Sequence, residues 1–148
     1  MLYVLLGLIA IQDILTGVFG APSTVATALA SHALGTRQAI LLSTVSQFVG
    51  PFLFGVAVAT AVGSEVVSLT AMTAPALCAA LASTVIWMIV AWYWRIPSSS
   101  THALIGGLLG AALAVGGPMA IHLNGLFKIL ISLTLTAPLG IVGGFVVN

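Results

Sequence analysis

This sequence has very few charged residues. Only 3% of its 148 residues are Asp, Glu, Lys or Arg, namely two acids and three bases, whereas an ordinary soluble domain carries about 25%. Water is therefore a poor solvent for most of its surface. The few charges form no run or patch of the kind that binds nucleic acid, so we expect no nucleic-acid partner. The single cysteine, Cys78, excludes an internal disulfide.

Groups that perform covalent chemistry are also missing. No three potential ligands have the spacing of a metal site, and we expect neither a metal nor a cofactor. A run of serines precedes His102. Neighbouring residues at the start of a helix do not face one another as a nucleophile and its base must. We therefore predict that the chain is not an enzyme.

What the sequence does contain is long apolar runs. A helix needs about 20 apolar residues to cross a bilayer, and three runs qualify: Gln38 to Val62, Ala74 to Trp94 and Gly125 to Val147. A fourth, Met1 to Leu34, is too long for one crossing and carries small and polar residues in its second half, so we expect a discontinuous first helix. No Lys or Arg precedes its apolar core, so we expect a retained membrane helix, not a signal peptide.

The run from His102 to Gly116 is too short to cross. At about 1.5 Å per residue it reaches only about 22 Å, against a hydrocarbon core of about 30 Å. We predict that it is one half of a re-entrant hairpin and turns back to the side of Arg95. Arg37, Arg95 and Lys128 then all lie on the cytoplasmic side, with Glu65 on the other, as the positive-inside rule favours.

The predicted fold class is therefore all-α: a polytopic transmembrane helical bundle with a broken first helix and a re-entrant hairpin, forming a single domain over residues 1–148. We expect a multi-pass protein of the plasma membrane. Gly106, Gly110 and Ala114 recur at helical spacing, which allows close helix packing within one subunit or at a subunit interface. Pro51 and Pro138, inside apolar runs, are expected to kink their helices.

Two polar segments interrupt the apolar runs: Thr16 to Thr27 and Ile96 to His102. Polar backbone at membrane depth must be buried in protein or line a wet cavity. In the second segment Pro97 precedes Ser98 to Thr101 at the start of a helix. That position is either a plain hydroxyl cap or an anion site at the positive end of the helix dipole. Paired broken segments indicate a substrate site in secondary transporters.

These two segments also carry a resemblance to a known family. The run IPSSSTHALIGGLLGAALAVGG is similar to the second signature of the inorganic phosphate transporters, the PiT family of sodium- or proton-coupled phosphate permeases. The run LTGVFGAPSTVATALASHALGTRQAILLSTVSQFVGPFLFG resembles the first signature and the helix after it. Family members contain two inverted repeats that each carry both signatures, and this chain resembles the N-terminal repeat alone.

The resemblance implies a phosphate pathway at the interface of the repeats. Its implied ligands are inorganic phosphate and a coupling Na⁺ or H⁺, and its implied surroundings are the lipid bilayer and either a second copy of the chain or a separate partner half. The residues that it marks as phosphate-contacting candidates are Ser98, Ser99, Ser100, Thr101, Ser23 and Thr27.

The first signature departs from the family pattern. Where the family has an aspartate and, three residues later, an asparagine, this chain has Gly20 and Ser23, with Pro22 between them. An intramembrane carboxylate is usually functional, and here it is missing. His102 and Asp13 are the candidates for a coupling or proton-linked role, each with a structural role as the alternative. Arg37, Arg95 and Lys128 are first topology signals and second charges that could attract phosphate.

Two functional predictions stay open. The first is secondary, cation-coupled transport of inorganic phosphate by one half of a transporter or by an antiparallel dimer. The second is a non-transporting remnant or accessory membrane subunit of a phosphate permease, suggested by Gly20 and by the end of the sequence at Asn148.

Overall fold

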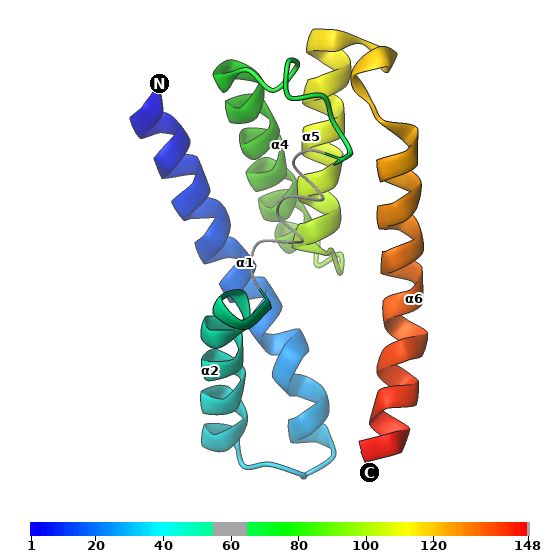
Figure 1. Cartoon of the computed structure of the whole chain (residues 1–148). Helices are drawn as coiled ribbons and strands as arrows, with labels where there is room; N and C mark the ends of the chain where they lie inside the picture. The colour runs from blue at the N-terminus through cyan, green and yellow to red at the C-terminus, as the bar shows by residue number, and fades with distance from the viewer. Residues whose placement is uncertain (55–64, 148) are drawn as a thin grey trace.

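The computed structural model describes residues 1–54 and 65–147, and its regular structure is helical (Figure 1). The predicted all-α fold class is confirmed. Within these described residues, three helices are long and apolar enough to cross a membrane: α1, α4 and α6. The elements in chain order are α1 (Leu2–Ala30), α2 (Thr36–Phe54), α4 (Ala74–Tyr93), α5 (Ser100–Gly116), the short 3₁₀ helix η2 (Pro118–Ala120) and α6 (Leu123–Val147).

The surface of this fold is that of a membrane protein. Its accessible area is 10352 Å² for 15.0 kDa, whereas a compact soluble protein of that mass exposes about 7,000 Å². Bulky apolar side chains such as Phe48, Phe52 and Phe145 point outward. In the membrane-crossing window of α6 no residue is buried. Lipid or further protein must cover this apolar area, because water solvates it poorly.

The first helix is continuous, which corrects the prediction of a break. Helix α1 runs from Leu2 to Ala30 with Pro22 inside it. Proline removes one backbone hydrogen bond, but a full break would leave several polar backbone groups unpaired in an apolar environment, at a higher cost. The Ser23 and Thr24 hydroxyls donate to the Gly20 carbonyl oxygen at 2.7 and 3.0 Å. These bonds satisfy polar groups inside the helix at the predicted break.

Helices α4 and α5 form a tightly packed antiparallel hairpin (Figure 1). Their contact depends on Gly107, because a Cβ there would meet both the Ala80 carbonyl oxygen and Thr84 Oγ1 at 2.6 Å. The buried Thr84 hydroxyl donates within α4 to the Ala80 carbonyl at 2.8 Å and lies 3.3 Å from the Ala103 carbonyl of α5. A glycine and a satisfied threonine thus allow the two backbones to approach closely.

Backbone hydrogen bonds close the open end of this hairpin. Residues 66–68, before α4, pair antiparallel with residues 120–122, after α5, and we call this pairing the basal ladder. The Ser68 N–H donates to the Ala120 carbonyl, and the His122 N–H donates to the Val66 carbonyl, both at 2.9 Å. Val67 and Ile121 form the bridge between these bonds. Both ends of the hairpin therefore lie together on one side.

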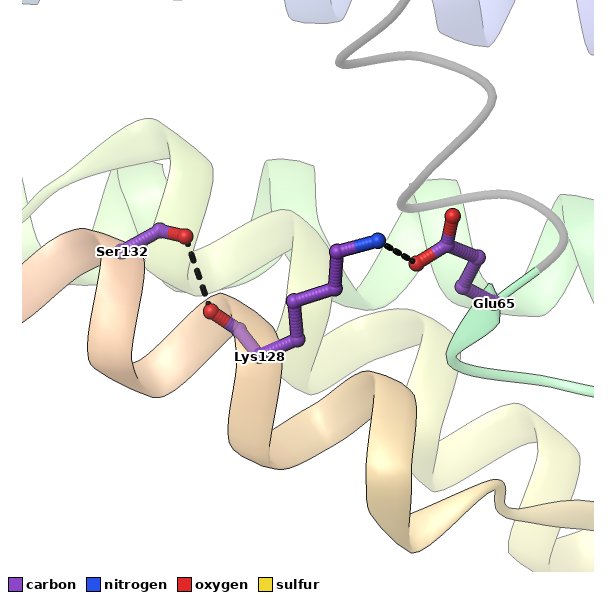
Figure 2. A network of polar contacts seen from close by, with 3 residues as sticks. All are labelled: Glu65, Lys128 and Ser132. Atoms are coloured by element: carbon purple, nitrogen blue, oxygen red, sulfur yellow. Dashed lines mark hydrogen bonds and ion pairs between the residues drawn. The ribbon is translucent and has the colours of Figure 1, made fainter.

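Glu65 attaches α6 to the basal ladder. The Lys128 ammonium, on the second turn of α6, lies 2.7 Å from Glu65 Oε2 (Figure 2). The Glu65 carbonyl also occupies the space that a Cβ on Gly125 would fill. A glycine near the start of α6 thus lets the two segments touch, and the ion pair lies beside that contact.

The basal ladder corrects the predicted topology. Because His122 bonds to Val66 and Lys128 pairs with Glu65, α5 does not return to the side of Arg95. Helices α4 and α5 instead run antiparallel as a hairpin, with Arg95 in the turn between them. Lys128 and Arg37 also do not share a side, since α2 begins at the end of the molecule opposite to the start of α6 (Figure 1).

The tip of the hairpin lies beside the middle of α1, not at the end of the molecule (Figure 1). Helix α1 passes the full height of the molecule and packs against α4. Of the span predicted for Gln38 to Val62, residues 38–54 belong to α2, whereas 55–62 lie outside the described residues. Pro138 lies within α6, and the kinks expected there and at Pro51 stay predictions.

The Gly107→Ala substitution tests the hairpin contact. The new methyl group would push α4 and α5 apart, and we expect a loss of about 1–3 kcal/mol in stability, measured as a lower midpoint of thermal unfolding in detergent. Gly110→Ala is the matched control in the same helix, because no atom lies within 4 Å of its added Cβ. Its midpoint should stay the same or rise. Equal effects of the two substitutions would contradict the close approach at Gly107.

A second pair of substitutions separates the two contacts of Glu65. Gly125→Ala would collide with the Glu65 carbonyl and should destabilise the chain by about 1–3 kcal/mol. Lys128→Gln removes an ion pair whose side chains are 64% and 44% exposed, which should change stability by less than about 1 kcal/mol. A larger loss for Lys128→Gln than for Gly125→Ala, in thermal unfolding at two salt concentrations, would refute this order.

Candidate functional site

The hairpin tip begins with a capping motif at the end of α4. The Ile96 N–H donates to the Ala91 carbonyl at 2.8 Å, and the Arg95 N–H donates to the Trp92 carbonyl at 3.0 Å. These two bonds form a Schellman motif, in which the residue after the cap is left-handed. Here that residue is Arg95, with φ 56°. Glycine adopts this conformation freely, whereas a residue with a side chain pays about 1 kcal/mol.

The other side of the tip is the capped start of α5. Ser99 is the N-cap, and its hydroxyl oxygen lies 3.5 Å from the His102 backbone nitrogen that it caps. The backbone N–H groups of Ser100 and Thr101 belong to the first turn, where a helix offers them no acceptor. One serine thus acts as the cap, while the positive end of the helix dipole stays available.

Trp87 orients the hydroxyl of Ser98. The Trp87 indole N–H donates to Ser98 Oγ at 2.9 Å. Indole nitrogen is only a donor, so Ser98 must accept, and its own hydroxyl proton is free to bind another group. This role of Trp87 was missed from the sequence. The contact joins α4 to the residues before α5 across the hairpin, and no local pattern signals it.

The structure brings the two polar segments of the sequence together at one cavity. The cavity has a volume of about 390 Å³ and lies between α1 and the hairpin tip. Phe19, Gly20 and Ser23 line it from α1, and the residues from Pro97 to Ser100 line it from the tip. Three of the predicted serines around the start of α5 thus line the same cavity as the predicted serine of α1, although they are far apart in the chain.

A neighbouring cavity of about 870 Å³ extends this space along α1. Ser23 and Ser98 line both cavities, so the two are contiguous. The larger one also contains Pro22 and Arg95. We call the two together the α1–tip cavity. Within the described residues that line it there is no carboxylate, and Arg95 is the one side chain that carries a charge at neutral pH.

The serines of the α1–tip cavity are not chemically equivalent. Ser23 donates its hydroxyl proton to the Gly20 carbonyl, so it presents lone pairs to the cavity. Ser98 accepts from Trp87 and presents a proton. In this conformation Ser98 suits an anion, whereas Ser23 must release the Gly20 carbonyl before it can donate to one.

A third space runs along the outer face of the hairpin. It has a volume of about 860 Å³ and reaches from Ser98, Ser99 and His102 at the tip along a strip of small residues. Gly106 and Gly110 line it and have no atom within 4 Å of an added Cβ. Packing of α5 on α4 therefore uses Gly107 and not this strip. Among the described residues nothing packs against Gly106 or Gly110, and both alternatives for the strip stay predictions.

The remaining candidates lie elsewhere. Thr101, Thr27 and Asp13 are exposed and are not among the residues that line the α1–tip cavity or the outer space. His102 lines the outer space only. Arg95, which the sequence suggested first as a topology signal and second as a charge that attracts phosphate, lines the larger part of the α1–tip cavity.

Comparison with known proteins gives a clear relationship. The model of the phosphate transporter family matches residues 16–148. The match begins at Thr16, the first residue of the first polar segment, and includes the second segment, so both sides of the α1–tip cavity fall within it. This is a family of transporters and not of enzymes, in agreement with the prediction.

Three relatives agree with this match. A protein of Bacillus subtilis named "Probable low-affinity inorganic phosphate transporter" is 35% identical over 136 residues, which are 90% of this chain and 40% of the relative. Proteins of the same name from Rhizobium meliloti and Mycobacterium leprae are each 36% identical, over 93% and 90% of this chain and 42% and 32% of their own length. This chain thus spans less than half of each. No solved structure matches it.

The Trp87–Ser98 bond can be tested by NMR. In a chain labelled with ¹⁵N-tryptophan, Ser98→Ala should move the indole N–H resonance that Trp87→Phe removes, because the acceptor is lost. The resonances of Trp92 and Trp94 should stay in place. Ser100→Ala is the control, since it removes a neighbouring hydroxyl with no bond to Trp87. A Trp87 resonance that is unmoved by Ser98→Ala would show that the bond is absent.

Proposed function

We propose that this chain, which belongs to the phosphate transporter family, forms part of a pathway that carries inorganic phosphate across the membrane. The observation that supports this most directly is the α1–tip cavity, where segments of both family signatures meet. A transport site has to lie within the membrane and be reached from a cavity, and the re-entrant hairpin supplies both conditions.

The chemistry of the cavity suits an oxyanion. Phosphate oxygens accept hydrogen bonds, and the Ser98 hydroxyl and the first backbone N–H groups of α5 are donors. These neutral donors hold an anion less tightly than a cluster of charges does, which suits a site that must also release its ligand. We propose Ser98 and Ser100 as the first contacts, with Ser99 as the cap that orients α5. Ser23 lines the opposite side of the cavity. Thr101 and Thr27 do not line it and are secondary candidates.

We further propose that the chain is one half of the transporter. It spans 40% and 42% of the relatives from Bacillus and Rhizobium, and its accessible area exceeds that of a compact protein of its size by about 3,300 Å². A separate partner half or a second copy in antiparallel orientation would cover part of this area and complete the pathway. We propose the plasma membrane as the membrane that the chain crosses several times.

Cation coupling is the remaining part of this proposal. A secondary transporter couples phosphate to Na⁺ or H⁺, and a cation needs oxygen ligands or an ionisable group. Gly20 supplies no carboxylate at the cavity. Asp13 on α1 and His102 on α5 are the candidates that this half offers, and further ligands would come from the other half. The alternative is a non-transporting accessory subunit, which Gly20 favours because the acid of the family pattern is missing there.

Uptake of radiolabelled phosphate into proteoliposomes tests transport. Vesicles that contain this chain alone, if it forms an antiparallel pair, should accumulate phosphate above empty vesicles. Ser98→Ala should reduce that uptake about tenfold, because it removes a hydroxyl donor from the ligand. Ser132→Ala is the control, since that hydroxyl donates to the Lys128 carbonyl within α6 and lies outside the cavity.

The outcomes separate the alternatives. Uptake equal to that of empty vesicles, with correct insertion, would exclude transport by this chain alone. Uptake that appears only when a second half is added would assign the chain to a two-part transporter. If a partner protein transports phosphate at the same rate with and without this chain, this chain is a non-transporting accessory subunit.

A further inference from the structure

Of the three basic residues in this chain, Arg95 is the one that lines the α1–tip cavity. Lys128 pairs with Glu65 beside the basal ladder. Arg37 lies in the first turn of α2, at an end of the molecule. Arg95 lies at the hairpin tip, beside the middle of α1, and lines the α1–tip cavity with Ser23 and Ser98. A charged residue within a membrane is costly and marks a functional site.

No acid neutralises Arg95 within the described part of the chain. The sequence contains two acids, Asp13 and Glu65. Glu65 is at the open end of the hairpin, in contact with Lys128. Asp13 lies on α1 outside the α1–tip cavity and within ion-pair distance of no described basic side chain. The cavity therefore carries a net positive charge and hydroxyl groups.

The backbone at Arg95 indicates that its side chain has a purpose. Arg95 occupies the left-handed position of the Schellman motif, with φ 56°. Glycine is the usual residue there because it alone adopts this conformation without strain. Keeping arginine costs conformational energy, and the capping bonds are made by its backbone alone. Neither capping bond uses the guanidinium.

We propose that Arg95 binds the phosphate anion in the α1–tip cavity. The inference rests on the proposed function and adds a source of positive charge to it. The serines of the two family signatures are neutral and do not provide that charge. The guanidinium presents planar, paired N–H donors that match the oxygens of phosphate. In a cavity without a carboxylate this one charge balances part of the charge of the anion. Any coupling cation then has to bind outside these residues.

Two other roles for Arg95 make different predictions. As a partner of the α4 dipole, its charge would stabilise the end of the helix, and removing it would lower stability. As a topology signal, it would act only during insertion. A phosphate-binding residue instead loses affinity when it is changed to glycine, while stability is unchanged or rises because the left-handed strain is relieved.

Equilibrium binding of radiolabelled phosphate to the full chain in lipid nanodiscs tests the proposal. Arg95→Gln and Arg95→Gly should each weaken binding about tenfold or more, and Arg95→Lys should retain part of it. Arg37→Gln removes the same charge elsewhere and should bind like the unaltered chain. Arg95→Gly should also unfold at an equal or higher temperature. Unchanged affinity in Arg95→Gln would overturn the role of Arg95 and leave the proposed function standing.

Chemical modification tests the same residue without a variant. Phenylglyoxal reacts with arginine side chains, and the sequence has only Arg37 and Arg95. Phosphate should slow the reaction at Arg95 and not at Arg37, measured by mass spectrometry of the two peptides. Equal rates at Arg95 with and without phosphate would overturn the inference. If the unaltered chain binds no phosphate above empty nanodiscs, phosphate binding by this half fails, and the role of Arg95 fails with it.

Discussion

The close contact of α4 with α5 at Gly107 is the constraint on which the rest of this structure depends. It aligns the two helices so that the hydroxyl-rich turn is their tip and the basal ladder is their open end. It also brings Trp87 to Ser98. Because α1 packs on α4, the same contact sets where the tip meets α1. The cavity between α1 and the tip therefore depends on the missing side chain of Gly107 and on the hydrogen bond of the buried Thr84 hydroxyl.

The functional properties of the tip come from how its polar groups are used, not from how many there are. Ser99 acts as the cap of α5, Ser23 donates inside α1, and Ser98 is turned outward by Trp87. Three serines that look alike in the sequence therefore have different roles: Ser99 is structural, Ser23 offers the cavity an acceptor, and Ser98 offers it a donor. Charge at the cavity comes from Arg95, since the family acid is replaced by Gly20.

Composition and short motifs predicted much of this protein. The apolar runs predicted α4 and α6 closely, and the serine run predicted the start of α5, because those signals are local. The break around Gly20 to Ser23 was wrong because an apolar environment favours a continuous helix even through proline. The side to which α5 returns depends on backbone pairing of Val67 with Ile121, which leaves no local pattern. The sequence suggested Arg95 first as a topology signal, because no local pattern shows that its turn lies against α1.

The basal ladder has a consequence for how the chain enters the membrane during synthesis. Since the two ends of the hairpin are paired, inserting α4 and α5 together leaves both ends on one side of the bilayer. What must be moved into the bilayer between the two helices is the short stretch around Arg95 and Pro97. The helix pair can then enter as a single apolar unit once its two ends have joined. Insertion of α4 should accordingly wait for α5, so that the two behave as one event in assembly and not as two successive crossings.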